Sequence, residues 1–72
     1  MRKVFKLQDL DCANCAAKME AAIKKLDGVN DATVSFMTQK LTLDADDDRF
    51  EAIVDECVKV CKRVEPDCVI LR

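Results

Sequence analysis

Two cysteines, Cys12 and Cys15, stand three positions apart in the segment DLDCANCAAKME, where a stretch of helix-forming residues begins. The backbone N–H groups in the first turn of a helix are unpaired, and with the helix dipole they favour a thiolate over a thiol. Thiolate is the form of cysteine that binds metal ions, and this spacing lets both sulfur atoms converge on one point. The segment therefore predicts a site for a soft metal ion.

The chemistry of two thiolates limits which metal ions the site can hold. Such a pair suits Cu(I), Zn(II), Cd(II), Pb(II) or Hg(II). It does not complete a tetrahedral zinc site, which takes four ligands, and the chain has no histidine and no second CxxC motif. A site with an incomplete set of protein ligands leaves the bound ion exposed, so that its ligands can be exchanged for those of a partner. We therefore expect a domain that receives a metal ion and gives it up again.

Two other interpretations of the cysteine pair stay open. Cys15 also lies on an apolar helical stripe, where a cysteine can be a small core residue. A CxxC pair at a helix start is also typical of thiol–disulfide enzymes of the thioredoxin type. Those proteins are longer and usually have an aromatic residue before the pair and a proline inside it, whereas the inner residues here are Ala13 and Asn14. A thiol–disulfide redox protein is therefore the less favoured alternative.

The periodicity of apolar residues predicts the elements that position this pair. In order, they are a strand at 4–10, a helix at 12–28 ending near Gly28, a hairpin at 29–46 with its turn at 38–40, a helix at 46–64 ended by Pro66, and a strand at 67–72. This β-α-β-β-α-β order predicts an α+β, ferredoxin-like fold: a four-stranded antiparallel sheet with both helices on one face.

Length and composition exclude several classes of protein. The chain has 72 residues, half of them apolar, which predicts one small domain over 1–72. Its net charge of −2 and its lack of Trp and Tyr argue against nucleic-acid binding. It has neither a signal peptide nor an apolar run of the roughly 20 residues that span a bilayer, so we expect a cytosolic domain. An odd count of five cysteines argues against a disulfide framework.

The segment LDCANCAAKMEAAIKKLDGV, residues 10–29, resembles the motif region of heavy-metal-associated domains. These domains occur as free metallochaperones and as cytosolic N-terminal domains of heavy-metal P-type ATPases. The resemblance covers essentially the whole chain and implies the same βαββαβ order. It also implies that the chain is the N-terminal domain of a longer protein and that it performs no catalysis itself.

The residue before the first cysteine bears on the choice of metal. Copper-binding members of this family typically carry a methionine two residues before the first cysteine, with threonine or histidine between, whereas this chain has Leu10 and Asp11. DCxxC, like VEPD at 64–67, resembles the zinc, cadmium and lead exporters and implies Asp11 as a ligand beside Cys12 and Cys15. Divalent Zn and Cd accept a carboxylate oxygen, whereas Cu(I) is satisfied by sulfur alone. Alternatively, Asp11 caps the helix.

The other three cysteines are expected mainly in the core. Cys57 and Cys61 lie one helical turn apart on an apolar stripe, and Cys68 alternates with Ile70 in the last strand. Cys61 is also a candidate third sulfur ligand. It lies near the end of its helix, and in this fold the loop after that helix approaches the loop that carries Cys12. The acidic run at 44–48 lacks the glycine of a calcium loop and predicts a helix start.

The expected function is binding and transfer of Zn(II), Cd(II) or Pb(II) through the DCxxC site, with Cu(I) as the alternative ion. The resemblance implies as partners the membrane and cytosolic domains of the same P-type ATPase, or a metallochaperone. It also implies a cytoplasmic domain of a protein in the cell membrane. A free-standing copper or mercury metallochaperone is the alternative. Lysines of the first helix are expected to form a solvated face, or to steer an acidic partner.

Overall fold

The chain alternates strands and helices in the order that the sequence predicts. The computed structural model describes residues 1–71. Its elements are β1 (Arg2–Gln8), α1 (Ala13–Lys24), β2 (Val29–Ser35), β3 (Lys40–Ala45), a short 3-10 turn (Asp47–Arg49), α2 (Phe50–Val64) and β4 (Val69–Leu71). The predicted βαββαβ order and the ferredoxin-like class are both confirmed.

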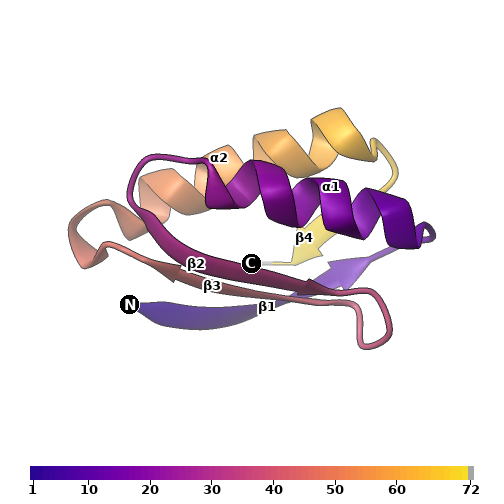
Figure 1. Cartoon of the computed structure of the whole chain (residues 1–72), viewed down its shortest axis with the longest axis horizontal. Coiled ribbons are helices and arrows are strands. Elements are labelled where there is room, and N and C mark those ends of the chain that lie inside the picture. Colours follow the sequence, from indigo (N-terminus) through magenta and orange to yellow (C-terminus); the bar gives the residue numbers. More distant parts are fainter. Residues whose placement is uncertain (72) are drawn as a thin grey trace.

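The four strands form one antiparallel sheet in the order β2-β3-β1-β4. Both helices lie on the same face of this sheet, as Figure 1 shows. β1 and β3 are therefore the central strands, while β2 and the short β4 form the edges. Within residues 1–71, neither helix has the length and apolar character needed to cross a membrane.

The core lies between the helices and the inner face of the sheet. Alternate residues of the central strands are buried, since successive side chains of a strand point to opposite faces: Phe5 and Leu7 in β1, and Leu41, Leu43 and Ala45 in β3. Each helix buries one stripe at helical spacing: Ala16, Met19 and Ile23 from α1, and Phe50, Ile53, Val54, Cys57, Val60 and Cys61 from α2. No polar or charged side chain among the described residues is buried.

The end of β1 departs from its predicted boundary, and this difference shapes the site. The apolar residues of 4–10 predicted a strand through Leu10, but β1 ends at Gln8. Asp9 has a positive φ of 63°, a left-handed conformation that turns the chain out of the sheet. Residues 9–12 are thereby released from pairing and form the loop that carries the chain into α1.

Candidate metal site

Cys12 occupies the N-cap position of α1. Its backbone is extended, with φ −128° and ψ 121°, and its sulfur accepts a hydrogen bond of 3.4 Å from the backbone N–H of Cys15. A cap side chain normally satisfies one of the unpaired N–H groups at the start of a helix. The alternative that Asp11 caps this helix is therefore wrong, because Cys12 holds the cap position.

The two cysteines differ in their protonation. The hydrogen bond from the backbone N–H of Cys15, followed by the hydrogen bond from the Cys15 side chain, lowers the pKa of Cys12 below its ordinary value of 9.0. The pKa of Cys15 is raised to about 11, first by the hydrogen bond to Cys12, then by desolvation and by the carboxylate of Glu65. Both side chains are half-buried. Cys12 is therefore the more readily ionised cysteine of the pair, and Cys15 is the one that keeps its proton more firmly.

Glu65 lies at the same loop end, although no local pattern pointed to it as part of the site. It directly follows α2 with an extended backbone, and its Oε2 accepts a hydrogen bond of 3.6 Å from the Sγ of Cys15. Its other carboxylate oxygen accepts from the N–H of Asp67 at 3.4 Å. The loop after α2 therefore reaches the cysteine pair, as expected for this fold. It brings a carboxylate there and not the sulfur of Cys61, the candidate third ligand.

The remaining predicted ligands lie apart from this contact. Asp11 is exposed in the loop just before Cys12. Cys61 is 1% exposed, and its thiol donates a hydrogen bond of 3.4 Å to the backbone carbonyl of Cys68, so it lies in the core. Cys57 and Cys68 are buried too, which confirms the core interpretation of both. Across residues 1–71, no three cysteine, aspartate or glutamate side chains already surround a common point.

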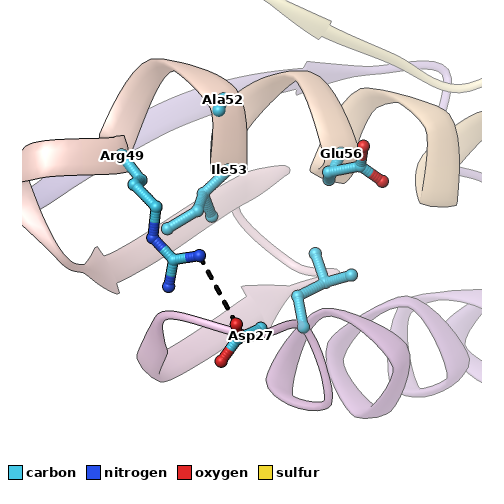
Figure 2. A pocket seen from close by; sticks show the side chains of 6 residues that line it. Asp27, Arg49, Ala52, Ile53 and Glu56 are labelled. Atoms are coloured by element: carbon cyan, nitrogen blue, oxygen red, sulfur yellow. Dashed lines mark hydrogen bonds and ion pairs between the residues drawn. The ribbon is translucent and has the colours of Figure 1, made fainter.

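A cavity of about 310 Å³ lies far from Cys12 and Cys15. It opens between the residues that follow α1 and the first turns of α2, and Figure 2 shows the ion pair of 3.4 Å between Arg49 and Asp27 at its edge. The other lining residues are Leu26, Ala52, Ile53 and Glu56. Cys12 caps the opposite end of α1, and a helix of this length spans roughly 18 Å. The candidate metal site is therefore the pair Cys12 and Cys15 at the start of α1, and not this cavity.

The unequal pKa values of the pair predict unequal reactivity. In metal-free, reduced protein near neutral pH we expect iodoacetamide to modify Cys12 before Cys15, because the thiolate is the reactive form. As the pH rises towards 11, Cys15 ionises and the two rates converge. Peptide mass spectrometry after timed quenching measures both rates. In Cys12→Ser the modification rate of Cys15 should rise, because the partner that chiefly raises its pKa is gone. Equal modification rates of the two cysteines in the wild-type chain at neutral pH would contradict the difference between their pKa values.

Two curated relatives are metal-transporting ATPases. The chain is 49% identical over 47 residues to the zinc/cadmium/lead-transporting P-type ATPase of Escherichia coli (strain K12), an alignment that covers 65% of the chain and 6% of the ATPase. It is 30% identical over 70 residues to the cadmium, zinc and cobalt-transporting ATPase of Bacillus subtilis (strain 168), covering 97% of the chain and 10% of the ATPase. The chain therefore spans about a tenth or less of the length of these relatives.

Solved structures of similar fold include small copper proteins and domains. The CopZ metallochaperone superposes with a TM-score of 0.77 at 17% identity, covering 99% of this chain and all of that one. The yeast copper transporter domain CCC2A superposes with a TM-score of 0.75 at 21% identity, covering 99% of this chain and 94% of that one. The family model for the heavy-metal-associated domain matches residues 4–63. The chain is thus a heavy-metal-binding domain and belongs to the heavy-metal-associated domain family.

Proposed function

We propose that this domain binds Zn(II), Cd(II) or Pb(II) through the sulfurs of Cys12 and Cys15, with Asp11 as an oxygen ligand. The observation that carries the proposal is the contact of the Glu65 carboxylate with a half-buried cysteine pair. Asp11 adjoins Cys12 in sequence, and Glu65 contacts Cys15 at 3.6 Å. Mixed sulfur and oxygen ligands suit borderline divalent ions better than Cu(I), which is satisfied by two or three sulfurs.

Glu65 joins this proposal as a second oxygen ligand. Its carboxylate accepts the hydrogen bond of the Cys15 thiol. When a metal ion displaces that proton, the same carboxylate would face the cation. A rearrangement of the loop would then bring two sulfurs and one or two oxygens around the ion. Two thiolates with a divalent ion are neutral overall, and one or two carboxylates give a net negative site. That charge favours a divalent ion over a monovalent one.

We further propose that the domain is the N-terminal regulatory domain of a heavy-metal-exporting P-type ATPase. The similarity to the metal-transporting ATPases of E. coli and B. subtilis supports this proposal. In such a protein the domain would lie on the cytoplasmic side, and its partners would be the membrane and cytosolic portions of the pump, or a metallochaperone. ATP hydrolysis would belong to the rest of that protein, since a heavy-metal-associated domain binds metal without catalysing a reaction.

Metal transfer would proceed through a shared-ligand intermediate. The cysteine pair lies at a loop end and is half-buried, so one side of a bound ion stays open to a partner. A sulfur or oxygen of the partner binds the ion before one of the domain's ligands leaves, and the ion never has to exist free in solution. A free-standing carrier of Cu(I) or Hg(II) remains the alternative, because two sulfurs alone suffice for those ions.

Replacement of the carboxylates tests which metal the site prefers. In Asp11→Asn and in Glu65→Gln we expect Zn(II) and Cd(II) affinity to fall about tenfold, while Cu(I) affinity stays within about twofold. Competition titrations against a chromophoric chelator under anaerobic conditions measure all three. Asp67→Asn is the matched control for loss of an exposed negative charge near the same loop. If both variants keep the wild-type preference between Zn(II) and Cu(I), neither carboxylate selects the metal.

A further inference from the structure

The side chain of Gln39, in the turn between β2 and β3, is hydrogen bonded to the loop of residues 9–12, which carries Cys12 and is called the metal loop below. Its Nε2 donates to the carbonyl oxygen of Leu10 at 2.7 Å and to that of Phe36 at 2.9 Å. Its Oε1 accepts from the backbone N–H of Leu10 at 3.0 Å. One amide side chain thus pairs with both backbone groups of Leu10, a residue 29 positions away in sequence.

This contact replaces the strand pairing that Leu10 has lost. β1 ends at Gln8, and the left-handed Asp9 carries the chain away from the sheet. The Leu10 side chain is nevertheless 2% exposed and belongs to the core, so its peptide groups lie in a partly buried setting. Backbone donors and acceptors in such a setting are costly to leave unpaired. The amide of Gln39 supplies one donor and one acceptor, as a neighbouring strand would do.

The backbone of Gln39 suggests that this amide has a specific role. Its φ is 55°, a left-handed conformation that glycine adopts without strain and that glutamine adopts rarely. Its backbone carbonyl also accepts a hydrogen bond of 2.8 Å from the N–H of Leu7. A glycine would fit the turn and keep that backbone bond, but it could not hold Leu10. The side chain is therefore better explained by its contact with the metal loop than by the turn.

We propose that Gln39 is a positioning residue that presets the metal loop for binding, an inference that rests on the proposed metal-binding function. Leu10 is fixed by its buried side chain and by the Gln39 amide, and it lies two residues before Cys12. Holding the Leu10 peptide limits the directions in which the chain enters the N-cap, and so fixes where the Cys12 sulfur lies relative to that of Cys15. A prearranged pair loses less conformational freedom on binding and holds the ion more tightly.

The test compares Gln39→Gly with the wild-type chain, using Cd(II) as the probe. Glycine suits the positive φ, so we expect the variant to fold, with a loss of stability limited to the unpaired peptide groups of Leu10. In the reduced metal-free protein, the amide hydrogen of Leu10 should exchange on the order of tenfold faster, because its acceptor is gone. The Cd(II) dissociation constant should rise about tenfold, the lower end of the range for residues that orient metal ligands. Cd(II) competition titration and NMR hydrogen exchange give the two readouts.

Ile53→Val is the matched control for a merely structural effect. Ile53 is 4% exposed and lines the cavity remote from Cys12 and Cys15. This variant should lose stability while leaving Cd(II) affinity and Leu10 exchange, measured relative to global unfolding, at wild-type values. Faster Leu10 exchange with unchanged Cd(II) affinity in Gln39→Gly would overturn the positioning role, and unchanged exchange would overturn the contact itself. If the wild-type chain binds no Cd(II), the proposed function fails, whatever the exchange data show.

Discussion

Replacing both Cys12 and Cys15 with serine is expected to weaken Cd(II) binding on the order of a thousandfold or more. The structure offers these two sulfurs at one loop end, and the carboxylates beside them do not hold a soft ion strongly by themselves. Serine also keeps the size of the side chain and can still accept the hydrogen bond at the N-cap. The fold should therefore persist while the affinity is lost, which circular dichroism and anaerobic Cd(II) titration measure together.

The Cys61→Ala variant tests whether a sulfur other than those of Cys12 and Cys15 binds the ion. The Cys61 thiol is in the core and hydrogen bonded to the carbonyl of Cys68, so its removal should leave the thiolate-to-Cd(II) charge-transfer spectrum unchanged. A weaker or shifted band in this variant would show that Cys61 reaches the ion as a third sulfur. Cd(II) binding retained in the double serine variant would show that the site lies elsewhere in the chain.

The largest expected effect on stability comes from Leu41→Ala. Leu41 is fully buried in the central strand β3, where it lies opposite Phe5 of β1 and Val34 of β2. Truncating a buried leucine removes its transfer free energy and leaves a cavity, a loss of about 3 kcal/mol in the free energy of unfolding. A domain of this size is stable by only roughly 4–11 kcal/mol, so the loss is a large fraction of the total. Urea unfolding monitored by circular dichroism measures it.

Met37→Ala provides the comparison on the same hairpin. Met37 is 88% exposed at the turn between β2 and β3, so its truncation should change the free energy of unfolding by less than about 0.5 kcal/mol. Equal losses in the two variants would mean that Leu41 does not pack as the structure has it. Because β3 pairs directly with β1, which leads into the metal loop, Leu41→Ala should also reduce Cd(II) binding wherever the unfolded fraction becomes appreciable.

The elements of this fold could be predicted from the sequence because its apolar residues follow two distinct periods. Phe5 and Leu7 alternate in a strand, while Ile53 and Cys57 recur at helical spacing, and all four are buried as expected. The end of β1 was less predictable. Apolar residues continue to Leu10, but Asp9 adopts a left-handed conformation that aspartate tolerates better than most residues and that no local pattern dictates.

One part of the candidate site could be predicted from neighbouring residues, whereas the other part depends on residues far apart in the sequence. The spacing of Cys12 and Cys15 at a helix start is a local signal, and the structure brings their side chains together. Glu65 and Gln39 act on the site from loops far along the chain, and only the packing of α2 and of the β2–β3 turn against the metal loop brings them there. The VEPD stretch was the one sequence signal near Glu65, and it pointed to a group of proteins without assigning a role to that residue.

The most direct test of this account is an anaerobic NMR titration of the reduced wild-type chain with Zn(II), followed through the amide and cysteine Cβ signals. We expect changes that saturate at one equivalent and centre on residues 9–16, which are the metal loop and the first turn of α1. A second group of changes should lie around Glu65, and Cys12 and Cys15 should show the Cβ shifts of zinc thiolates. Unchanged Cβ signals at these two cysteines, or shifts centred on Cys57, Cys61 and Cys68, would contradict it.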